Sequence, residues 1–430
     1  MKHPFQIVLA NEAGTHLFSS VKNQILVFGL TGASQGKLIG SWIDPVDNLQ
    51  PLQKQQQEKI KKLVTEVEDG DKKVKVPKIP TPGPGAPPIY NYIRSLYLSH
   101  QDKYLIGISD SDKSVLVFEI DYQNNENCIN LIKRQIFPKR PSSITVDEED
   151  DTIIVADKFG DVYSMDIKGP VIDDEKKLAP ILGHVSMLSE VLIVKRNAKK
   201  FIITGDRDEH IRITNYPKTY VVKDWLFGAD HKEFISVLNI PKFDDSLLIS
   251  GGGDDFISLW NWHESKFITK FSIKDYVTQF LTDSHLPPER FLTEESEREM
   301  CISELIVLTS DSKHYIVILC ENIPALILLE LTSDLTFNYV QTFTTTFSIV
   351  DITAIEESGT IIASVDNEQD GEDKNLIQFY KLSNGKLQDA SISNASISTS
   401  ITELNPEIVE SRHDFYPLYS VNTLRKRSEH

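Results

Sequence analysis

One pattern of strands recurs along the chain at a nearly constant interval, and it limits the possible folds more than any other feature. Each copy is an apolar strand, a short turn rich in Gly and Asp, and a second strand, which is the pattern of a β-hairpin. The clearest copies are YLIGISDSDKSVLVFEI (Tyr104 to Ile120), TIIVADKFGDVYSMDI (Thr152 to Ile167), FIITGDRDEHIRITNY (Phe201 to Tyr216) and LLISGGGDDFISLWNW (Leu247 to Trp262). The first apolar residues after these turns, Val115, Val162, Ile211 and Ile257, lie 47, 49 and 46 residues apart. Weaker copies at Ile25, Leu326 and Ile377 bring the count to seven.

A period in the mid-forties with about four strands per unit is typical of the blades of a β-propeller. In VLVFEI, both sets of alternating residues are largely apolar, as expected for a blade that is packed between two neighbours. The sequence therefore predicts an all-β fold, a seven-bladed WD-repeat β-propeller in which residues 1–430 form a single domain. A pair of β-sandwiches is the alternative, but a sandwich does not require a repeat.

Three segments fall outside the repeat. Residues 44–88 begin as a Gln-, Lys- and Glu-rich stretch and end as a Pro/Gly-rich one, so we predict a disordered insertion followed by an extended linker. Because the entropic cost of closing a loop grows only slowly with its length, removing residues 47–76 is expected to leave the fold nearly unchanged. Residues 275–299 are charged and predict a loop insertion with a short helix. Residues 416–430 form a tail with the basic run Arg425, Lys426 and Arg427.

Composition excludes several classes of protein. The formal net charge is −18, so the surface as a whole repels phosphate and any contact with RNA needs a local basic patch or a partner. The three cysteines form no CxxC pair, which argues against a disulfide framework or zinc site and fits a reducing compartment. We expect no signal peptide and no membrane contact, since the most apolar stretch, 315–331, is interrupted by polar residues and Pro324. The Lys-rich run at 72–78 is a candidate nuclear-import signal, so we expect the nucleus, with the cytoplasm as the alternative.

No motif of a known catalytic or metal site is present, so we predict no catalytic residues, no metal and no cofactor in this chain. The glycines of GGGDD at Gly251 are explained by a tight hairpin turn. His184, in LGHVSML, follows Gly183 at the place where WD-type blades carry a Gly-His pair. We therefore predict that its imidazole is a buried hydrogen-bonding group and neither a ligand nor a base.

Two charged clusters are candidate binding sites. The turn DRDEHIR alternates acids and bases, and either it is a solvated hairpin with internal ion pairs or it is an edge on which a partner docks. Its candidate partner-binding residues are Asp206, Arg207, Asp208, His210 and Arg212. The second cluster consists of Lys133, Arg134, Lys139 and Arg140. It is either a phosphate contact to RNA or a solvated surface, and the sequence alone favours the solvated surface.

Several longer pieces match one family. They are PGPGAPPIYNYIR (82–94), ISDSDKSVLVF (108–118), ADKFGDVYS (156–164), ILGHVSML (181–188), DRDEHI (206–211), WLFG (225–228) and YPLYSVNTLRKRSEH (416–430). Over nearly its whole length the chain resembles the fungal WD-repeat, non-catalytic subunit of tRNA (guanine-N7-)-methyltransferase. ADKFGDVYS and LGHVSML are the most specific pieces, because generic WD repeats do not require them. The WD dipeptide is mostly missing; Trp260, for example, is followed by Asn261.

The resemblance implies a function that the repeat spacing does not show. In this family the propeller forms a heterodimer with a separate Rossmann-type catalytic subunit, which holds S-adenosylmethionine and methylates a guanine N7 in the tRNA variable loop. The propeller stabilises the active conformation of that subunit, and tRNA is held mainly by the partner. The family's basic docking residue corresponds to Arg212, with His210 beside it where some relatives carry Lys.

Two hypotheses follow: a scaffold subunit of a tRNA methyltransferase, or a generic WD-repeat adaptor that binds other proteins. An enzyme in its own right is a distant third. Under the first, Arg212→Glu is expected to weaken docking and to leave the stability of the free chain unchanged, since an exposed substitution shifts stability by only ~0.5 kcal/mol.

Overall fold

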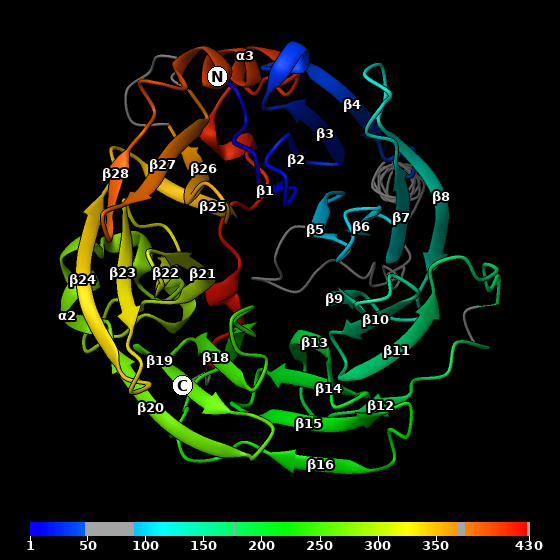
Figure 1. Ribbon diagram of the computed structural model, residues 1–430, viewed down its shortest axis with the longest axis vertical. Coiled ribbons are helices and arrows are strands. Elements are labelled where there is room, and N and C mark those ends of the chain that lie inside the picture. The colour runs from blue at the N-terminus through cyan, green and yellow to red at the C-terminus, as the bar shows by residue number, and fades with distance from the viewer. Residues whose placement is uncertain (48–89, 175–176, 368–374, 428–430) are drawn as a thin grey trace, which may run out of the picture.

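The computed structural model describes residues 1–47, 90–174, 177–367 and 375–427, and seven four-stranded sheets surround a central axis in it (Figure 1). Within each sheet the strands are antiparallel and follow one another in chain order from the axis outward. This arrangement confirms the predicted seven-bladed propeller. Every anchor residue of the repeat, from Ile25 to Ile377, lies in the third strand of its own blade. Most of the predicted insertion, residues 48–88, and the candidate nuclear-import run at 72–78 lie outside the described residues.

The blades are numbered from the N-terminus. Blade 1 consists of β1 (Ile7–Ala10), β2 (His16–Val21), β3 (Gln24–Gly29) and β4 (Leu38–Ile43), and blade 2 of β5 (Ile93–Leu98), β6 (Tyr104–Ser109), β7 (Ser114–Ile120) and β8 (Ile129–Ile136). Blade 3 consists of β9 (Pro141–Val146), β10 (Thr152–Asp157), β11 (Asp161–Asp166) and β12 (Leu182–Gly183), and blade 4 of β13 (Leu188–Arg196), β14 (Lys199–Asp206), β15 (Ile211–Tyr216) and β16 (Val222–Trp225). Blade 5 consists of β17 (Ile235–Asn239), β18 (Leu247–Gly252), β19 (Phe256–Asn261) and β20 (Lys266–Ser272). Blade 6 consists of β21 (Ile302–Ser310), β22 (Lys313–Cys320), β23 (Ala325–Leu331) and β24 (Phe337–Thr344), and blade 7 of β25 (Ser348–Ile355), β26 (Thr360–Asp366), β27 (Ile377–Ser383) and β28 (Lys386–Asp389).

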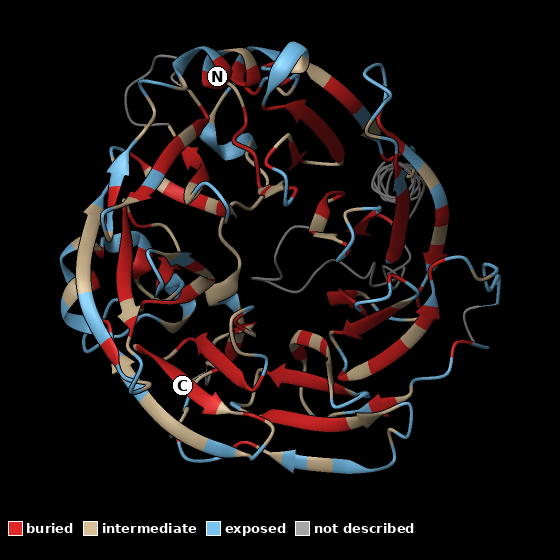
Figure 2. Ribbon diagram, viewed as in Figure 1, coloured by how far each residue is buried: buried red, intermediate tan, exposed pale blue. Residues whose placement is uncertain are grey.

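The hydrophobic core is a ring of interfaces between neighbouring blades. The middle strands carry most of the buried residues, and β2 and β3 are buried throughout, whereas outer strands such as β16 and β20 contain no buried residue (Figure 2). Each apolar cluster in the described part of the chain joins two adjacent blades; one, for example, combines Ile249 and Leu259 of blade 5 with Ile316 and Ile327 of blade 6. Burial on both faces explains why the strands are apolar on both sides.

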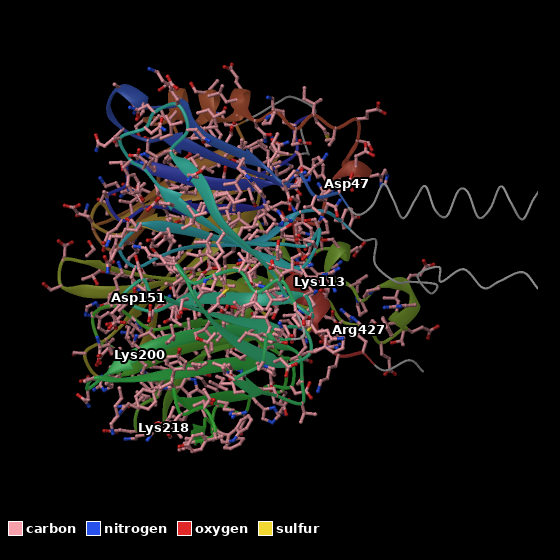
Figure 3. All side chains as sticks on the ribbon, turned by 90° about the vertical axis from the view of Figure 1, so that its right-hand side faces the viewer. Asp47, Lys113, Asp151, Lys200, Lys218 and Arg427 are labelled. Carbon is pink, nitrogen blue, oxygen red and sulfur yellow. The ribbon has the colours of Figure 1, made fainter. Side chains whose placement is uncertain are left out.

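The antiparallel order gives the propeller two distinct faces. The turns between second and third strands, such as the one at Lys113, share a face with the C-terminal tail, and we call it the upper face. Figure 3 shows Asp47, Lys113 and Arg427 toward this face and Asp151, Lys200 and Lys218 toward the opposite, lower face. The central channel contains a cavity of about 690 Å³ lined by innermost strands of several blades, including Leu9, Leu98 and Leu308.

The ring is closed by chain ends outside the blades. Each blade is built from consecutive strands, so blades 1 and 7 share no sheet. Instead, the His3 N–H donates to Glu407 O (3.0 Å) and the Val409 N–H donates to Met1 O (2.9 Å). Helix α3 (Ala395–Leu404) adds Ile397 and Ile401 to the core between these two blades.

The remaining helices are short. They are η1 (Gly32–Ser34), α2 (Lys274–Val277), η3 (Thr278–Phe280), η4 (Asp283–His285), η5 (Glu289–Phe291), η7 (Arg412–Asp414) and η8 (Val421–Leu424). Four of them, α2 to η5, lie in or beside the segment 275–299, which connects β20 to β21. Among the described residues, no helix is both long enough and apolar enough to cross a bilayer.

Candidate partner-docking face

The charged turn of blade 4 joins β14 to β15 on the upper face. Asp206, at the end of β14, is only 2% exposed, and its Oδ1 accepts the N–H of Asp208 (2.8 Å) and of His210 (3.0 Å). Glu209 between them has φ +68°. The buried carboxylate thus satisfies two main-chain donors and closes the turn, as Asp side chains commonly do.

The other oxygen of Asp206 anchors a buried histidine. His184 Nδ1 lies 3.0 Å from Asp206 Oδ2, and its Nε2 lies 2.8 Å from Thr204 Oγ1. Its side chain is 1% exposed, and its ring packs edge-on against Trp225. The predicted structural role of His184 is therefore confirmed.

Blade 5 repeats this network with other residues. His231 Nδ1 lies 2.8 Å from Asp254 Oδ2, and its Nε2 lies 3.0 Å from Ser250 Oγ. Trp260 Nε1 donates to the same hydroxyl at 2.9 Å. Because two blades build the same arrangement, it belongs to the scaffold rather than to a reaction centre.

Arg212 does not lie on an exposed strand edge, so the prediction that it is a surface residue was wrong. It is 9% exposed, its Nη1 donates to Gly183 O (2.9 Å), and its guanidinium lies 5.4 Å from the centre of the Trp225 ring. Burial lowers its pKa. The reason is its position on β15, which lies between blades 3 and 5, so residues 211–214 are all buried. Arg212 thus supports the face from beneath.

The other residues of the turn differ in exposure. Arg207 donates from Nε to Leu424 O (2.6 Å) in the C-terminal tail. Asp208 pairs with Lys426 (2.6 Å) and, although burial opposes the shift, this contact and one with Ser186 lower its pKa. The His210 side chain is 41% exposed and packs edge-on against Trp225. Of the five predicted residues, Asp206 and Arg212 are buried, whereas Arg207, Asp208 and His210 are partly open to solvent.

Three exposed apolar residues surround this turn, and the sequence analysis did not single them out. Val185 is fully exposed in the loop between β12 and β13, Phe227 is 70% exposed after β16, and Phe159 is 64% exposed in the turn between β10 and β11. Apolar residues in turns resemble core residues, so only their place in the family-specific pieces HVSML, WLFG and ADKFG could have drawn attention to them. We call Phe159, Val185, His210 and Phe227 the docking patch.

Main-chain contacts hold the segments of the docking patch together. The His184 N–H donates to Gly160 O (2.8 Å), and the Leu226 N–H donates to Ile211 O (2.9 Å). Gly160 has φ +96°, and a Cβ there would lie 2.4 Å from His184 O, so only glycine permits this approach. Exposed large apolar side chains on segments held together in this way are typical of a site of protein interaction.

The four predicted phosphate-contact residues do not form one surface. Lys133 is 6% exposed and donates to Asp166 O (2.7 Å), while Arg134 pairs with Asp44 (2.9 Å) and Asp112 (2.8 Å). These two neighbouring residues of β8 point to opposite faces of blade 2, so Lys133 contacts blade 3 and Arg134 contacts Asp44 after blade 1 and Asp112 of its own blade. Lys133 is thus buried and Arg134 is held by two carboxylates, so neither is a freely solvated surface group, whereas Lys139 and Arg140 lie on the upper face. A contact of these residues with RNA stays a prediction.

Lys139 and Arg140 belong to a different basic group, which also includes Arg94 and Lys158. Arg94 and Arg140 share one carboxylate, Asp110, at 2.5 and 3.7 Å. Burial and the nearby charges of Arg94 and Arg140 lower the pKa of Lys158 to about 8. Lys139 Nζ lies 4.2 Å from the centre of the Phe159 ring, so this basic group adjoins the docking patch. No group of His, Cys, Asp and Glu within the described ranges is placed to hold a metal ion.

Residues 17–179 and 172–384 match the model of the protein family described as the tRNA methyltransferase TRM82 WD40 domain. The chain is 50% identical to the tRNA (guanine-N(7)-)-methyltransferase non-catalytic subunit TRM82 of Debaryomyces hansenii and 49% identical to that of Meyerozyma guilliermondii, over all of both chains. Identity to the subunit of Saccharomyces cerevisiae is 38%, over 100% of this chain and 99% of that one.

Solved structures show the same fold at low sequence identity. The structure of U3-55K has a TM-score of 0.55 at 12% identity, covering 86% of this chain and 90% of that chain, and the RRP9 WD40 repeats have a TM-score of 0.54 with the same identity and coverage. The matches over the full length decide the family. This chain belongs to the TRM82 family of WD40 proteins, the non-catalytic subunits of tRNA (guanine-N7-)-methyltransferase.

Proposed function

We propose that this chain is the scaffold of a heterodimeric tRNA (guanine-N7-)-methyltransferase and that the catalytic subunit docks on the upper face of blades 3 and 4. The observation that carries the proposal is the docking patch, in which exposed apolar side chains from three loops lie beside a turn fixed by buried hydrogen bonds. The names of the relatives supply the enzyme to which such a non-catalytic subunit belongs.

The docking patch suits a tight complex for two physical reasons. Each apolar side chain that becomes buried contributes about 1.5–3 kcal/mol. The patch is also preorganised, because Asp206 closes the turn and His184 locks the loop that carries Val185. A rigid surface loses little entropy on binding. Such a surface favours the partner conformation that fits it, and this is how the propeller stabilises the active state of the catalytic subunit.

The relatives are named as non-catalytic subunits, which supports placing the chemistry on the partner. S-adenosylmethionine binds the catalytic subunit alone, and that subunit methylates the guanine N7 in the tRNA variable loop. The tRNA is held mainly by the partner. The group of Arg94, Lys139, Arg140 and Lys158 supplies an additional phosphate contact, since three of these cations interact with one carboxylate, that of Asp110, and Lys139 adjoins them.

Substitutions of the exposed patch test the docking proposal. Val185→Asp and Phe227→Asp introduce a charge where the partner buries apolar surface, so each is expected to weaken binding of the catalytic subunit at least about tenfold. Both side chains are exposed, so the melting temperature of the free chain should stay unchanged. The matched control is Ile392→Asp, because Ile392 is 91% exposed beyond blade 7. Binding is measured by calorimetric titration, and N7-methylguanosine by mass spectrometry of tRNA.

Full affinity in both patch variants would move the interface elsewhere. Failure of the unaltered chain to bind any catalytic methyltransferase subunit would instead favour the generic adaptor, and mass spectrometry of a native pull-down would then identify the partner.

A further inference from the structure

The C-terminal residues 416–427 cross the upper face from the junction of blades 7 and 1 to blade 4 (Figure 1), and we call them the C-terminal strap. At its start, the Tyr416 N–H donates to His3 Nε2 (2.9 Å), and the Tyr416 ring packs against Tyr90 at 4.8 Å. In its middle, the carboxylate of Glu321 accepts three consecutive main-chain N–H groups, from residues 420, 421 and 422, at 2.5–2.8 Å.

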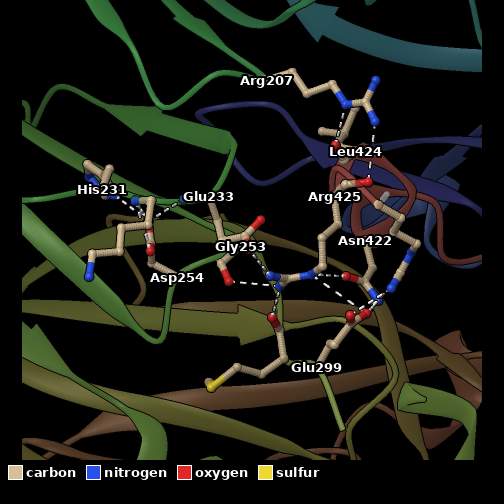
Figure 4. Close-up of polar contacts among 12 residues, drawn as sticks. Arg207, His231, Glu233, Gly253, Asp254, Glu299, Asn422, Leu424 and Arg425 are labelled. Atoms are coloured by element: carbon tan, nitrogen blue, oxygen red, sulfur yellow. Dashed lines mark hydrogen bonds and ion pairs between the residues drawn. The ribbon is translucent and has the colours of Figure 1, made fainter. Parts of the chain in front are cut away.

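Two arginines near the end of the strap are bound by acids and carbonyls of blades 5 and 6 (Figure 4). Arg425 is 11% exposed along its side chain; it pairs with Glu233 (2.9 Å) and donates to Gly253 O (2.8 Å). Arg427 donates to both oxygens of Glu299 at 2.7 and 2.6 Å. Glu299 belongs to the insertion between β20 and β21, so the insertion and the basic tail hold each other. Charge-assisted and bidentate contacts of this kind are the strongest hydrogen bonds in proteins.

The strap ends on the turn that supports the docking patch. The hydrogen bonds from the Arg207 guanidinium go to the strap carbonyls Leu424 O (2.6 Å) and Arg425 O (3.3 Å), as Figure 4 shows. The Arg207 N–H in turn donates to Met187 O (2.9 Å), two residues after Val185. A continuous path of contacts therefore leads from the strap through Arg207 to the exposed loop of the docking patch.

We propose that the C-terminal strap is a positioning element for the partner-docking face. It holds the turn at residues 206–211 in the conformation that the catalytic subunit binds, and Arg207 is the positioning residue that connects the two. The inference rests on the proposed function, since it assumes that the partner docks on this face. Because linkage is reciprocal, a bound catalytic subunit must also hold the strap more firmly on the propeller.

The test uses the full-length chain with Arg207→Ala or Arg425→Ala. Arg207→Ala removes the guanidinium that joins the turn to the strap, whereas Arg425→Ala removes the contacts that hold the strap on Glu233 and Gly253. In each variant, affinity for the purified catalytic subunit should fall by about tenfold, within the usual range of coupling between sites. In the free chain, amide hydrogen exchange at Asp208 and His210 should accelerate in both variants. Arg207→Lys keeps a donor for the carbonyls and should restore much of both properties. The double variant should lose less affinity than the sum of the two single losses, because both substitutions act through the position of the same strap.

Arg412→Ala is the matched control. Arg412 is also a C-terminal arginine, bound to both oxygens of Asp366 at 3.2 and 2.7 Å, but it lies on blade 7. It should leave partner affinity and exchange at 206–211 unchanged, even where it lowers the melting temperature. Unaltered exchange and affinity in Arg207→Ala would overturn the positioning role. If the unaltered chain does not bind the catalytic subunit, the proposed function has failed, and hydrogen exchange still decides whether the strap orders the turn.

Discussion

The Arg212 guanidinium lies between the carbonyl of Gly183 and the Trp225 ring, and the residue is largely buried. Replacing it with Glu leaves a buried carboxylate with no cation to pair with, facing the carbonyl oxygen that Arg212 now binds. We therefore expect Arg212→Glu to lower the free energy of unfolding by roughly 3–5 kcal/mol, as when a buried ion loses its partner. Partner binding should fall with it. Denaturant unfolding of the free chain measures the change. Normal stability combined with weak binding would show instead that Arg212 contacts the partner directly.

Residues of this face differ in how far their roles could be predicted from sequence. The buried hydrogen-bonding role of His184 was predicted correctly, because the histidine of a Gly-His pair before a blade usually has this role. The exposure of Arg212 was predicted wrongly, because a charged side chain in an otherwise apolar third strand resembles a surface residue. Its burial depends on the two neighbouring blades, which the local sequence does not show. Val185 was missed for the opposite reason, since the apolar side chain gives no local sign that it faces solvent.

At the scale of elements, the third strands were predictable and the closure of the ring was not. Third strands such as β7 and β19 carry long apolar runs after an Asp- or Gly-containing turn, so their spacing shows in the sequence. Outer strands such as β12, with two residues, leave no such pattern. The closure depends on pairing between the N-terminal residues and a segment some 400 positions away, and no local periodicity encodes a contact of that kind.

Helix α3 provides a test of that closure. Ile401 is fully buried between blades 1 and 7, whereas Ile408 is 74% exposed on the adjoining segment. Ile401→Ala should lower the free energy of unfolding by about 2–5 kcal/mol, because it leaves a cavity in the core that joins the two ends of the ring. Ile408→Ala should change it by only ~0.5 kcal/mol. Thermal and denaturant unfolding compare the two, and equal small effects would mean that the ring closes without α3.

Taken as a whole, the propeller directs three acidic side chains from different blades toward its axis. Glu190 of β13, Glu304 of β21 and Asp351 of β25 are partly buried on innermost strands, and Glu304 and Asp351 line the cavity of the central channel. Burial raises the pKa of Glu190 to about 7 and that of Asp351 to about 7. Burial, followed by the charges of Asp351 and Glu190, raises the pKa of Glu304 to about 8. The three groups therefore form one electrostatic unit that exists only in the assembled ring.

This unit makes the stability of the ring depend on pH. In the unfolded chain these carboxyls titrate near pH 4, so between about pH 4.5 and 8 the folded state binds more protons than the unfolded state. The free energy of unfolding should therefore fall as pH rises from about 5 to 8, where the buried carboxyls become charged. Glu304→Gln removes one such charge and relieves its repulsion with Asp351, so it should raise stability at pH 8 and flatten the dependence. Glu12→Gln is the matched control, because the Glu12 side chain is 73% exposed at the lower mouth of the channel. Denaturant unfolding from pH 5 to 8.5 gives the comparison. Parallel curves for the unaltered chain and Glu304→Gln would mean that channel water solvates these carboxylates as well as bulk water does.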